Sequence, residues 1–225
     1  MTYKGIIFDL NGTMLLDSHL HEIAWFEIAK ALREKPLTIE EFQINGHGRT
    51  NAAIIAYLCG TPPDQVTIDD IIERKEGLYR EMCLQSKANF KLADGVAEFL
   101  NQVKELNIAR TIATGSYIKN VNFYFDHLNL GSWFNMKDIV FDDGLFPGKP
   151  EPFPYLRAAE QLGLHPKECV VFEDSYSGIT SAIKAEIGRI ITVEPELDAS
   201  KVKAIGKVYK MVNGFNGLLL QEIIN

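Results

Sequence analysis

The sequence predicts an α/β fold, a doubly wound parallel sheet with an inserted helical region, on two observations. Short apolar runs rich in β-branched residues recur along the chain, and segments with helical periodicity separate them. Residues 18–86 break this alternation because one helical pattern follows another there. We therefore expect a Rossmann-like core sheet with an all-helical cap domain inserted after its first strand.

The core strands are predicted from five apolar runs that are too short for helices. These runs are Gly5–Phe8, Ala109–Ala113, Asp138–Phe141, Cys169–Phe172 and Arg189–Val193. Between them, Pro154–Gly163 and Ser177–Ala185 have the apolar period and the end signals of helices. Strands that alternate with helices imply a parallel sheet covered on both faces.

The cap helices are predicted from apolar spacing and from signals at their ends. Residues 18–33 place apolar side chains at helical spacing. Thr38–Glu41 and Thr67–Asp70 each have the pattern of a capping box that opens a helix. A further helix is expected over Thr50–Cys59, because Gly60 and the two prolines that follow end it.

Length and composition limit the classes of function. The 225 residues suit a core at 1–16 and 88–225 with a cap at 17–87, and 46% hydrophobic residues are enough for a core. The net charge of −7 gives no basic surface for nucleic acid or an anionic membrane. No targeting segment, membrane span or cysteine pair is apparent, so we expect a cytoplasmic monomer that acts on small molecules.

Polar residues follow three of the predicted strands. Asp9 follows the first, Thr114 with Gly115 and Ser116 the second, and Glu173 with Asp174 the fourth. The carboxyl ends of parallel strands meet at the edge where open α/β sheets bind ligands. Each residue alone is ordinary for a turn, but their conjunction points to one site.

The residue types at this edge suit phosphoryl transfer. The Asp9 carboxylate can attack phosphorus, and the paired acids after the fourth strand offer the hard oxygens that Mg²⁺ prefers. Thr114–Ser116, interpreted as a strand-to-helix turn, offers hydroxyl and N–H groups to an anion. Lys149, between Gly148 and Pro150, is expected to hold a fixed ammonium that neutralises the phosphoryl charge.

In this order, the pieces resemble the four motifs of the haloacid dehalogenase superfamily, in the branch with a helical cap between the first two motifs. The resemblance implies a magnesium-dependent enzyme in which Asp9 is the nucleophile and a metal ligand. Residue 11 would give its main-chain carbonyl to the metal, and Glu173 and Asp174 would complete the metal site. Thr114 and Lys149 would hold the phosphoryl oxygens.

The likeness is greatest to β-phosphoglucomutases and sugar-phosphate phosphatases. His21 and Trp25 match the entry into the mutase cap, the loop Gly46–Arg49 resembles its substrate loop, and Lys75 its cap lysine. A mutase also holds a second phosphate, for which Arg49, with Ser116 and Asn120 from the core, is the candidate, while Gly115 is expected to bind substrate through its N–H. The implied substrate is a small phosphorylated metabolite, most simply a sugar phosphate.

Position 11 departs from the superfamily, which has an aspartate there as the proton donor and acceptor. An amide can do neither, and losing one acid/base group costs on the order of a hundred to ten thousand-fold in rate. We therefore expect impaired turnover, whether Asn11 is an introduced change or belongs to a naturally slow enzyme. Leu16 also stands where the family usually has an aspartate, and Asp17 follows one place later.

Three alternatives stay open at this point. The chain would be a non-catalytic phosphometabolite binder if the site had lost its chemistry. It would resemble phosphonoacetaldehyde hydrolases if Lys75 formed a Schiff base with the substrate. Dehalogenases also lack aspartate at position 11, but their site resembles one without magnesium, whereas Glu173 and Asp174 suit a metal.

Overall fold

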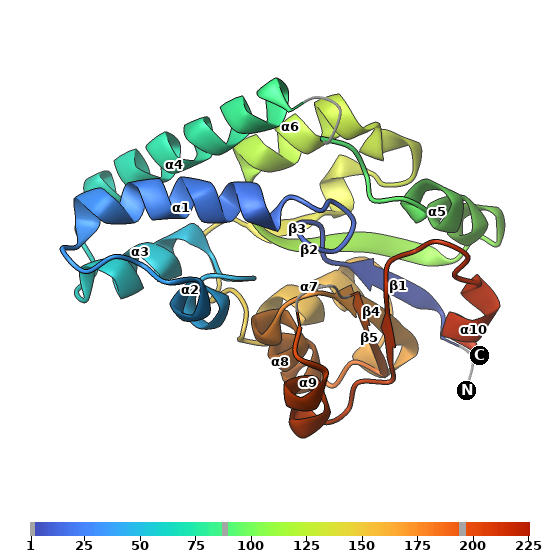
Figure 1. Cartoon of the computed structure of the whole chain (residues 1–225). Helices are drawn as coiled ribbons and strands as arrows, with labels where there is room; N and C mark the ends of the chain where they lie inside the picture. The colour runs from blue at the N-terminus through green and yellow to red at the C-terminus, as the bar shows by residue number, and fades with distance from the viewer. Residues whose placement is uncertain (1–2, 87–89, 194–196) are drawn as a thin grey trace.

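The core of the molecule is a parallel sheet, shown in the computed structural model, which describes residues 3–86, 90–193 and 197–225 (Figure 1). Within those residues, six strands lie in the order β3-β2-β1-β4-β5-β6, and every neighbouring pair is parallel. They are β1 (Gly5–Phe8), β2 (Ala109–Tyr117), β3 (Val140–Asp142), β4 (Cys169–Glu173), β5 (Arg189–Val193) and β6 (Lys210–Val212). The predicted α/β fold class is confirmed, and β6 is a strand that the sequence reading missed.

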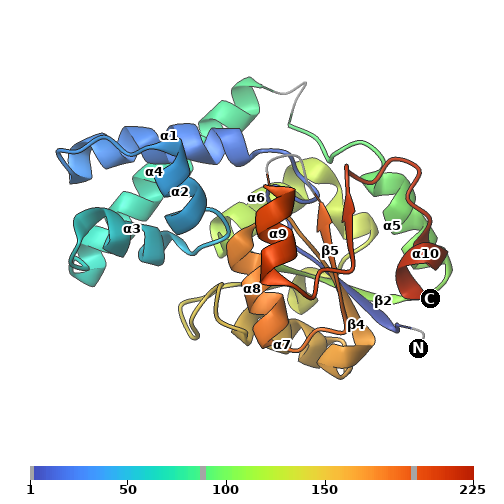
Figure 2. The same ribbon diagram turned by 60° about the horizontal axis from the view of Figure 1, so that its bottom comes forward.

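Helices cover both faces of the sheet (Figures 1 and 2). Ile6 and Phe8 of β1 pack on one face with α5, α6 and α10, while Ile7 packs on the other with α7 and α8. This alternation follows from the two-residue period of a strand. The helices are α5 (Val96–Glu105), α6 (Ile118–Leu128), α7 (Phe153–Gln161), α8 (Tyr176–Lys184), α9 (Ala199–Ile205) and α10 (Leu220–Ile224), with 3-10 turns at Leu130–Ser132, Met136–Asp138 and Pro166–Glu168.

Four helices lie together beyond the carboxyl end of β1 (Figure 1). They are α1 (Ser18–Leu32), α2 (Ile39–Asn45), α3 (Asn51–Cys59) and α4 (Gln65–Gln85). A core of their own, which includes Trp25, Phe42 and Ile55, holds these helices together. The division into cap and core stays a prediction, and its second boundary, at residues 87 and 88, lies outside the described residues.

The ends of these helices test the predicted signals. Thr38 and Glu41 form the predicted capping box at α2, and α3 ends at Gly60, whose φ is 71°. The second predicted box is wrong, because α4 begins at Gln65 and Asp64 caps it by accepting the Thr67 N–H. In the part of the chain that is described, no helix is both long and apolar enough to cross a membrane.

Candidate active site

The site begins at Asp9, the first residue after β1. Its N–H donates to the Phe172 carbonyl of β4 at 2.9 Å, which fixes the backbone between two central strands. Lys149 Nζ donates to Asp9 Oδ1 at 2.5 Å and to Glu173 Oε1 at 2.6 Å. Burial raises the pKa of the Asp9 carboxyl to about 7. The charge of Lys149 only partly offsets this rise, and the charge of Glu173 adds to the rise.

Lys149 is held by two carboxylates in a buried position. Burial alone would lower the pKa of its ammonium, but the charges of Asp9 and Glu173 outweigh burial and raise that pKa. The Lys149 Nζ also lies 5.0 Å from the centre of the Tyr155 ring. The ammonium is therefore a fixed charge beside the Asp9 carboxylate.

Glu173, at the end of β4, is fully buried and has both oxygens in use. Its Oε1 accepts from Lys149 and from the Tyr155 hydroxyl at 2.9 Å. Its Oε2 accepts from the Asp174 N–H at 2.8 Å and from the Ser175 N–H and Oγ at 2.8 and 3.0 Å. A Cβ on Gly178 would lie 1.6 Å from Glu173 Oε1, so this helix turn also packs closely on the carboxylate.

Asp174 lies against the loop that follows Asp9. Its Oδ1 accepts from Thr13 Oγ1 at 2.9 Å, and a Cβ on Gly12, where φ is 81°, would lie 2.0 Å from Asp174 Oδ2. A glycine at position 12 is required by both the positive φ and this close approach. Burial, together with the charges of Glu173 and Asp9, raises the pKa of Asp174 well above its usual range.

The metal-binding groups at the site suit a magnesium ion whose remaining ligands are substrate phosphate and water. No group of three His, Cys, Asp or Glu side chains suited to a metal occurs among residues 3–86, 90–193 and 197–225. Two carboxylates, the buried Asp9 and the partly exposed Asp174, line one pocket. Mg²⁺ is commonly held by one or two carboxylates, with substrate phosphate and water as its other ligands.

The Asn11 side chain is held by hydrogen bonds at both ends. Its Oδ1 accepts from Ser116 Oγ at 2.8 Å and from Thr114 Oγ1 at 3.4 Å. Its Nδ2 donates to Asp17 Oδ2 at 2.7 Å and to the Tyr124 hydroxyl at 2.8 Å.

The predicted strand-to-helix turn at Thr114–Ser116 is wrong, because β2 continues to Tyr117. The hydroxyls of Thr114 and Ser116 therefore stand on an extended strand.

Asp17 is a buried carboxylate that the sequence reading did not place in the site. It accepts from Asn11, from the Tyr79 hydroxyl and from the Gly12 N–H at 3.3 Å, and its Oδ2 lies 3.3 Å from His21 Nε2. Burial would raise its pKa, but the hydrogen bond and charge of His21, with the bonds from Tyr79 and Asn11, lower the pKa below its usual value.

On the cap side, a buried network surrounds Lys75. Its Nζ donates to Glu76 Oε1 at 2.9 Å and lies 2.7 Å from His21 Nδ1. Burial lowers the pKa of Lys75. Glu76 also accepts from Asn51 at 2.8 Å and from Asn120 at 2.7 Å. Burial alone would raise the pKa of Glu76, but the charges of Lys75 and His21 outweigh it and lower that pKa to about 2.

A pocket of about 90 Å³ brings most of the predicted site residues together. It is lined by Asp9, Asn11, His21, Gly46, Arg49, Lys75, Thr114, Gly115, Ser116 and Asp174. Asn51 and Glu76 also line it, although no sequence motif marked them. Asn120, a candidate for holding a second phosphate, is fully buried and bonded to Glu76 and Arg80 instead.

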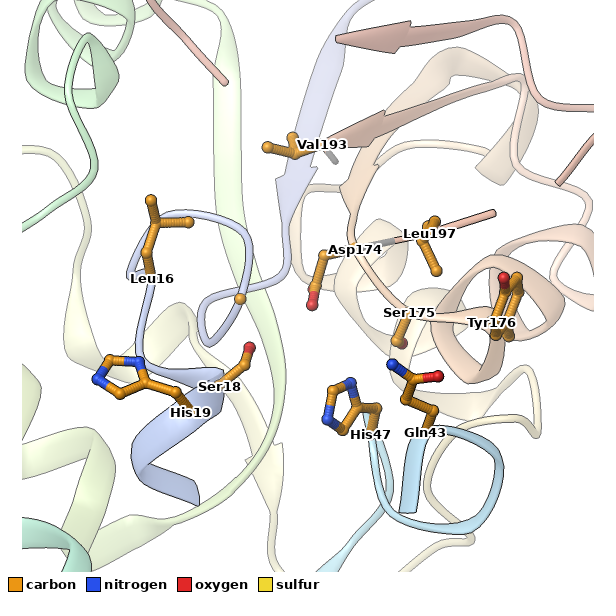
Figure 3. Close-up of a pocket in the computed structure, with 11 residues that line it drawn as sticks. Leu16, Ser18, His19, Gln43, His47, Asp174, Ser175, Tyr176, Val193 and Leu197 are labelled. Carbon is orange, nitrogen blue, oxygen red and sulfur yellow. The ribbon is translucent and has the colours of Figure 1, made fainter. Parts of the chain in front are cut away.

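A second hollow of about 100 Å³ adjoins the first and shares Asp174, Ser18 and His47 with it. Figure 3 shows Leu16, Ser18 and His19 on one side of this hollow, Leu197 and Tyr176 on the other, and Asp174 between them. Leu16 is 52% exposed here, whereas its neighbours Met14 and Leu15 are buried. Asp174 is therefore accessible from two sides.

Comparisons with known proteins identify the family of this chain. The family model for haloacid dehalogenase-like hydrolases matches residues 3–186. A phosphorylated carbohydrates phosphatase of Thermotoga maritima is 30% identical over 88% of each chain, and a β-phosphoglucomutase of Bacillus subtilis is 28% identical over 81% of this chain and 79% of the relative. The crystal structure of a haloacid dehalogenase hydrolase, family IA, variant 3, from Entamoeba histolytica superposes with a TM-score of 0.85 at 35% identity, covering 98% of this chain and 97% of that chain.

Proposed function

Because the chain belongs to the haloacid dehalogenase-like hydrolases, we propose that it is a phosphatase that removes the phosphoryl group from a small phosphorylated sugar or polyol. One observation carries the proposal. The buried Asp9 carboxylate is bonded to Lys149 and opens into a pocket that also holds Thr114 and cap residues. The names of the relatives, which include a carbohydrate phosphatase and a sugar phosphomutase, support the same substrate class.

In the proposed reaction Asp9 attacks phosphorus, the P–O bond to the sugar oxygen breaks, and an aspartyl-phosphate forms. Water then hydrolyses it to inorganic phosphate and the free Asp9 carboxylate. Lys149 neutralises charge on the nucleophile and on the phosphoryl oxygens, and the Thr114 hydroxyl donates to one of those oxygens. Glu173 keeps Lys149 in place, since both of its oxygens are already bonded within the protein. This role differs from that of a metal ligand, which the family resemblance implied.

We propose that Asp9, Asp174 and the main-chain carbonyl of Asn11 hold the magnesium ion. When bound, Mg²⁺ would supply positive charge to the phosphoryl oxygens. The support is the chemistry of the two carboxylates, Asp9 and Asp174, because burial and neighbouring negative charge raise the pKa of each and a cation would favour their ionised forms.

We expect turnover to be slow because Asn11 cannot exchange a proton. The leaving oxygen must then take its proton from water, at a rate cost of roughly a hundred to ten thousand-fold. Acyl phosphates, whose leaving group needs no proton, are the exception. They should therefore be hydrolysed faster than sugar phosphates.

The pocket favours hydrolysis over mutase chemistry. A mutase must hold a second phosphate, yet the cap side of this pocket presents the ionised Glu76 carboxylate. Asn120 is committed to Glu76 and Arg80, which leaves Arg49 as the cation available from the loop Gly46–Arg49. A neutral leaving group with hydroxyls suits Glu76, Lys75 and Asn51 better than an anion does.

The test is phosphate release from a panel of sugar phosphates, glucose 1-phosphate and acetyl phosphate, with magnesium or with EDTA. We expect release that requires magnesium, and a loss of at least a thousandfold in Asp9→Asn, which removes the nucleophile. Asp198→Asn changes an exposed carboxylate and should keep full activity. Binding of these metabolites without any turnover would identify a binder instead and overturn the proposal.

The setting proposed for this activity is the cytoplasm. Cys59, Cys83 and Cys169 are free thiols, as is usual in a reducing compartment. The monomeric state stays a prediction, which light scattering of the purified chain measures.

A further inference from the structure

We propose that Asp17 is a positioning residue that forms one functional pair with Asn11. Its buried carboxylate orients the Asn11 amide and makes an aspartate at position 11 incompatible with the site. This inference deepens the proposed phosphatase function and rests on it for its effect on turnover. It accounts for an amide at a position where the catalytic motif otherwise has an acid.

The carboxylate of Asp17 faces hydrogen-bond donors. It is 2% exposed, and it accepts from Asn11 Nδ2 at 2.7 Å, from the Tyr79 hydroxyl and from the Gly12 N–H at 3.3 Å. His21 Nε2 is 3.3 Å from the same Oδ2. On its other side, His21 Nδ1 lies 2.7 Å from the Lys75 amine. The position therefore suits a negative charge.

The Asp17 charge sets the orientation of the Asn11 amide. An ionised carboxylate only accepts, so the NH₂ group of Asn11 must face it. The amide oxygen then faces the hydroxyls of Ser116 and Thr114, at 2.8 and 3.4 Å. Thr114 Oγ1 in turn accepts from the Ser116 N–H at 3.1 Å. Asp17 thus acts on the proposed phosphoryl-binding hydroxyl through Asn11, without contacting the substrate itself.

An aspartate at position 11 would reverse the strongest contact in this arrangement. Its second oxygen would replace Nδ2, 2.7 Å from Asp17 Oδ2, so two acceptors would face each other in a buried site. Like charges at such a distance disfavour the folded state. Asn11→Asp alone is therefore expected to weaken the protein rather than restore a working acid/base group.

The exchanged pair should be compatible again. With Asn11→Asp and Asp17→Asn together, the amide at position 17 donates to the carboxylate at position 11, and its oxygen still accepts from the Gly12 N–H. The Tyr79 hydroxyl can accept as well as donate, so it tolerates the amide. The exchange keeps one charge at the site and moves it to the position from which it can reach the leaving group.

A double-mutant cycle tests the pair through the midpoint of thermal unfolding, measured in EDTA so that no metal contributes. We expect Asn11→Asp to lower Tm by roughly 5 °C or more, Asp17→Asn to lower it by a smaller amount, and the exchange to recover at least half of the summed loss. Asn11→Ala, which removes the amide without adding charge, should lower Tm by less than Asn11→Asp does. If Asn11→Asp does not fold, recovery of folded protein in the exchanged form supports the pairing instead.

Phosphate release gives the second readout. We expect Asn11→Asp alone to gain no activity, and the exchanged form to exceed the unmodified chain by about tenfold or more in kcat, because position 11 then carries an acid/base group. Additive Tm losses, or a stable and more active Asn11→Asp, would overturn the pairing. Absence of turnover in every form would overturn the proposed function, while the Tm cycle would still decide the pairing.

Discussion

At the scale of single residues, the Tyr155 hydroxyl forms a hydrogen bond to a buried carboxylate, and its contribution to stability can be measured. Its OH donates at 2.9 Å to Glu173 Oε1, the oxygen that also holds Lys149. Tyr155→Phe keeps the ring beneath Lys149 and removes only this bond, so we expect the free energy of unfolding to fall by about 1.5–3 kcal/mol. Urea unfolding of the variant and the unmodified chain measures this difference in free energy.

A matched control is Tyr3→Phe. The Tyr3 hydroxyl donates at 2.9 Å to the uncharged Gly188 carbonyl in a more exposed position, and its loss should cost about 1 kcal/mol or less. Equal losses in the two variants would mean that the charge of Glu173 adds nothing to the bond.

Sequence motifs reveal residues that stand at strand ends, and they miss those that act from elsewhere. Asp9 and Asp174 could be predicted because each directly follows an apolar run. Tyr155 lies on a helix with an ordinary apolar face, and its polar role exists only because folding sets it against Glu173, 18 residues away in sequence. Asp17 had no sequence signal either, since one of its partners, Tyr79, is 62 residues away.

At the scale of elements, Glu76 connects α4 to α6. It accepts from Asn120 of α6 and pairs with Lys75 of its own helix, both within 2.9 Å. Its pKa of about 2 in the folded protein lies below the ordinary 4.5, so folding favours the ionised form. The resulting stability is present above about pH 4.5 and is lost as pH falls toward 2.

We therefore expect Glu76→Gln to destabilise the protein at pH 7 by about 3 kcal/mol, with the difference from the unmodified chain shrinking between pH 4.5 and 2. Denaturant unfolding at a series of pH values measures this difference. Glu73→Gln, one turn earlier on α4, removes a half-exposed partner of Lys119 and should cost less than about 1 kcal/mol. A difference for Glu76→Gln that stays constant with pH would contradict the assignment.

Element boundaries were predictable where apolar pattern and backbone agree. β1 and β5 have the predicted bounds, since each is a short, mostly buried run rich in apolar or β-branched residues. β2 was predicted to end at Ala113, but pairing with β3 up to Tyr117 extends the strand through polar residues. The start of α4 was misplaced because Asp64 and Thr67 are both capping residues, and only the backbone decides which of them caps.

At the scale of the whole molecule, the pocket exists because residues of the helical insertion and of the sheet meet in it. Arg49 and Lys75 come from the helical insertion and Thr114 from β2, yet all three line one pocket. Periodicity predicted both sets of elements but not their relative position, which the family resemblance implied. The second hollow beside Asp174 had no sequence signal, since its lining comes from segments that are far apart in the sequence (Figure 3).

Magnesium should stabilise this arrangement as a whole. Burial and neighbouring carboxylate charge make Asp9 and Asp174 harder to ionise, and both face one pocket, so a cation there favours their ionised forms. At magnesium concentrations about 100 times Kd, the gain is about 2.7 kcal/mol, or roughly 5–10 °C in Tm. Asp174→Asn should lose this gain, whereas Asp198→Asn, which keeps a side chain able to cap α9, should retain it. A thermal scan with and without magnesium measures both, and an equal shift in the two variants would show that the ion binds elsewhere.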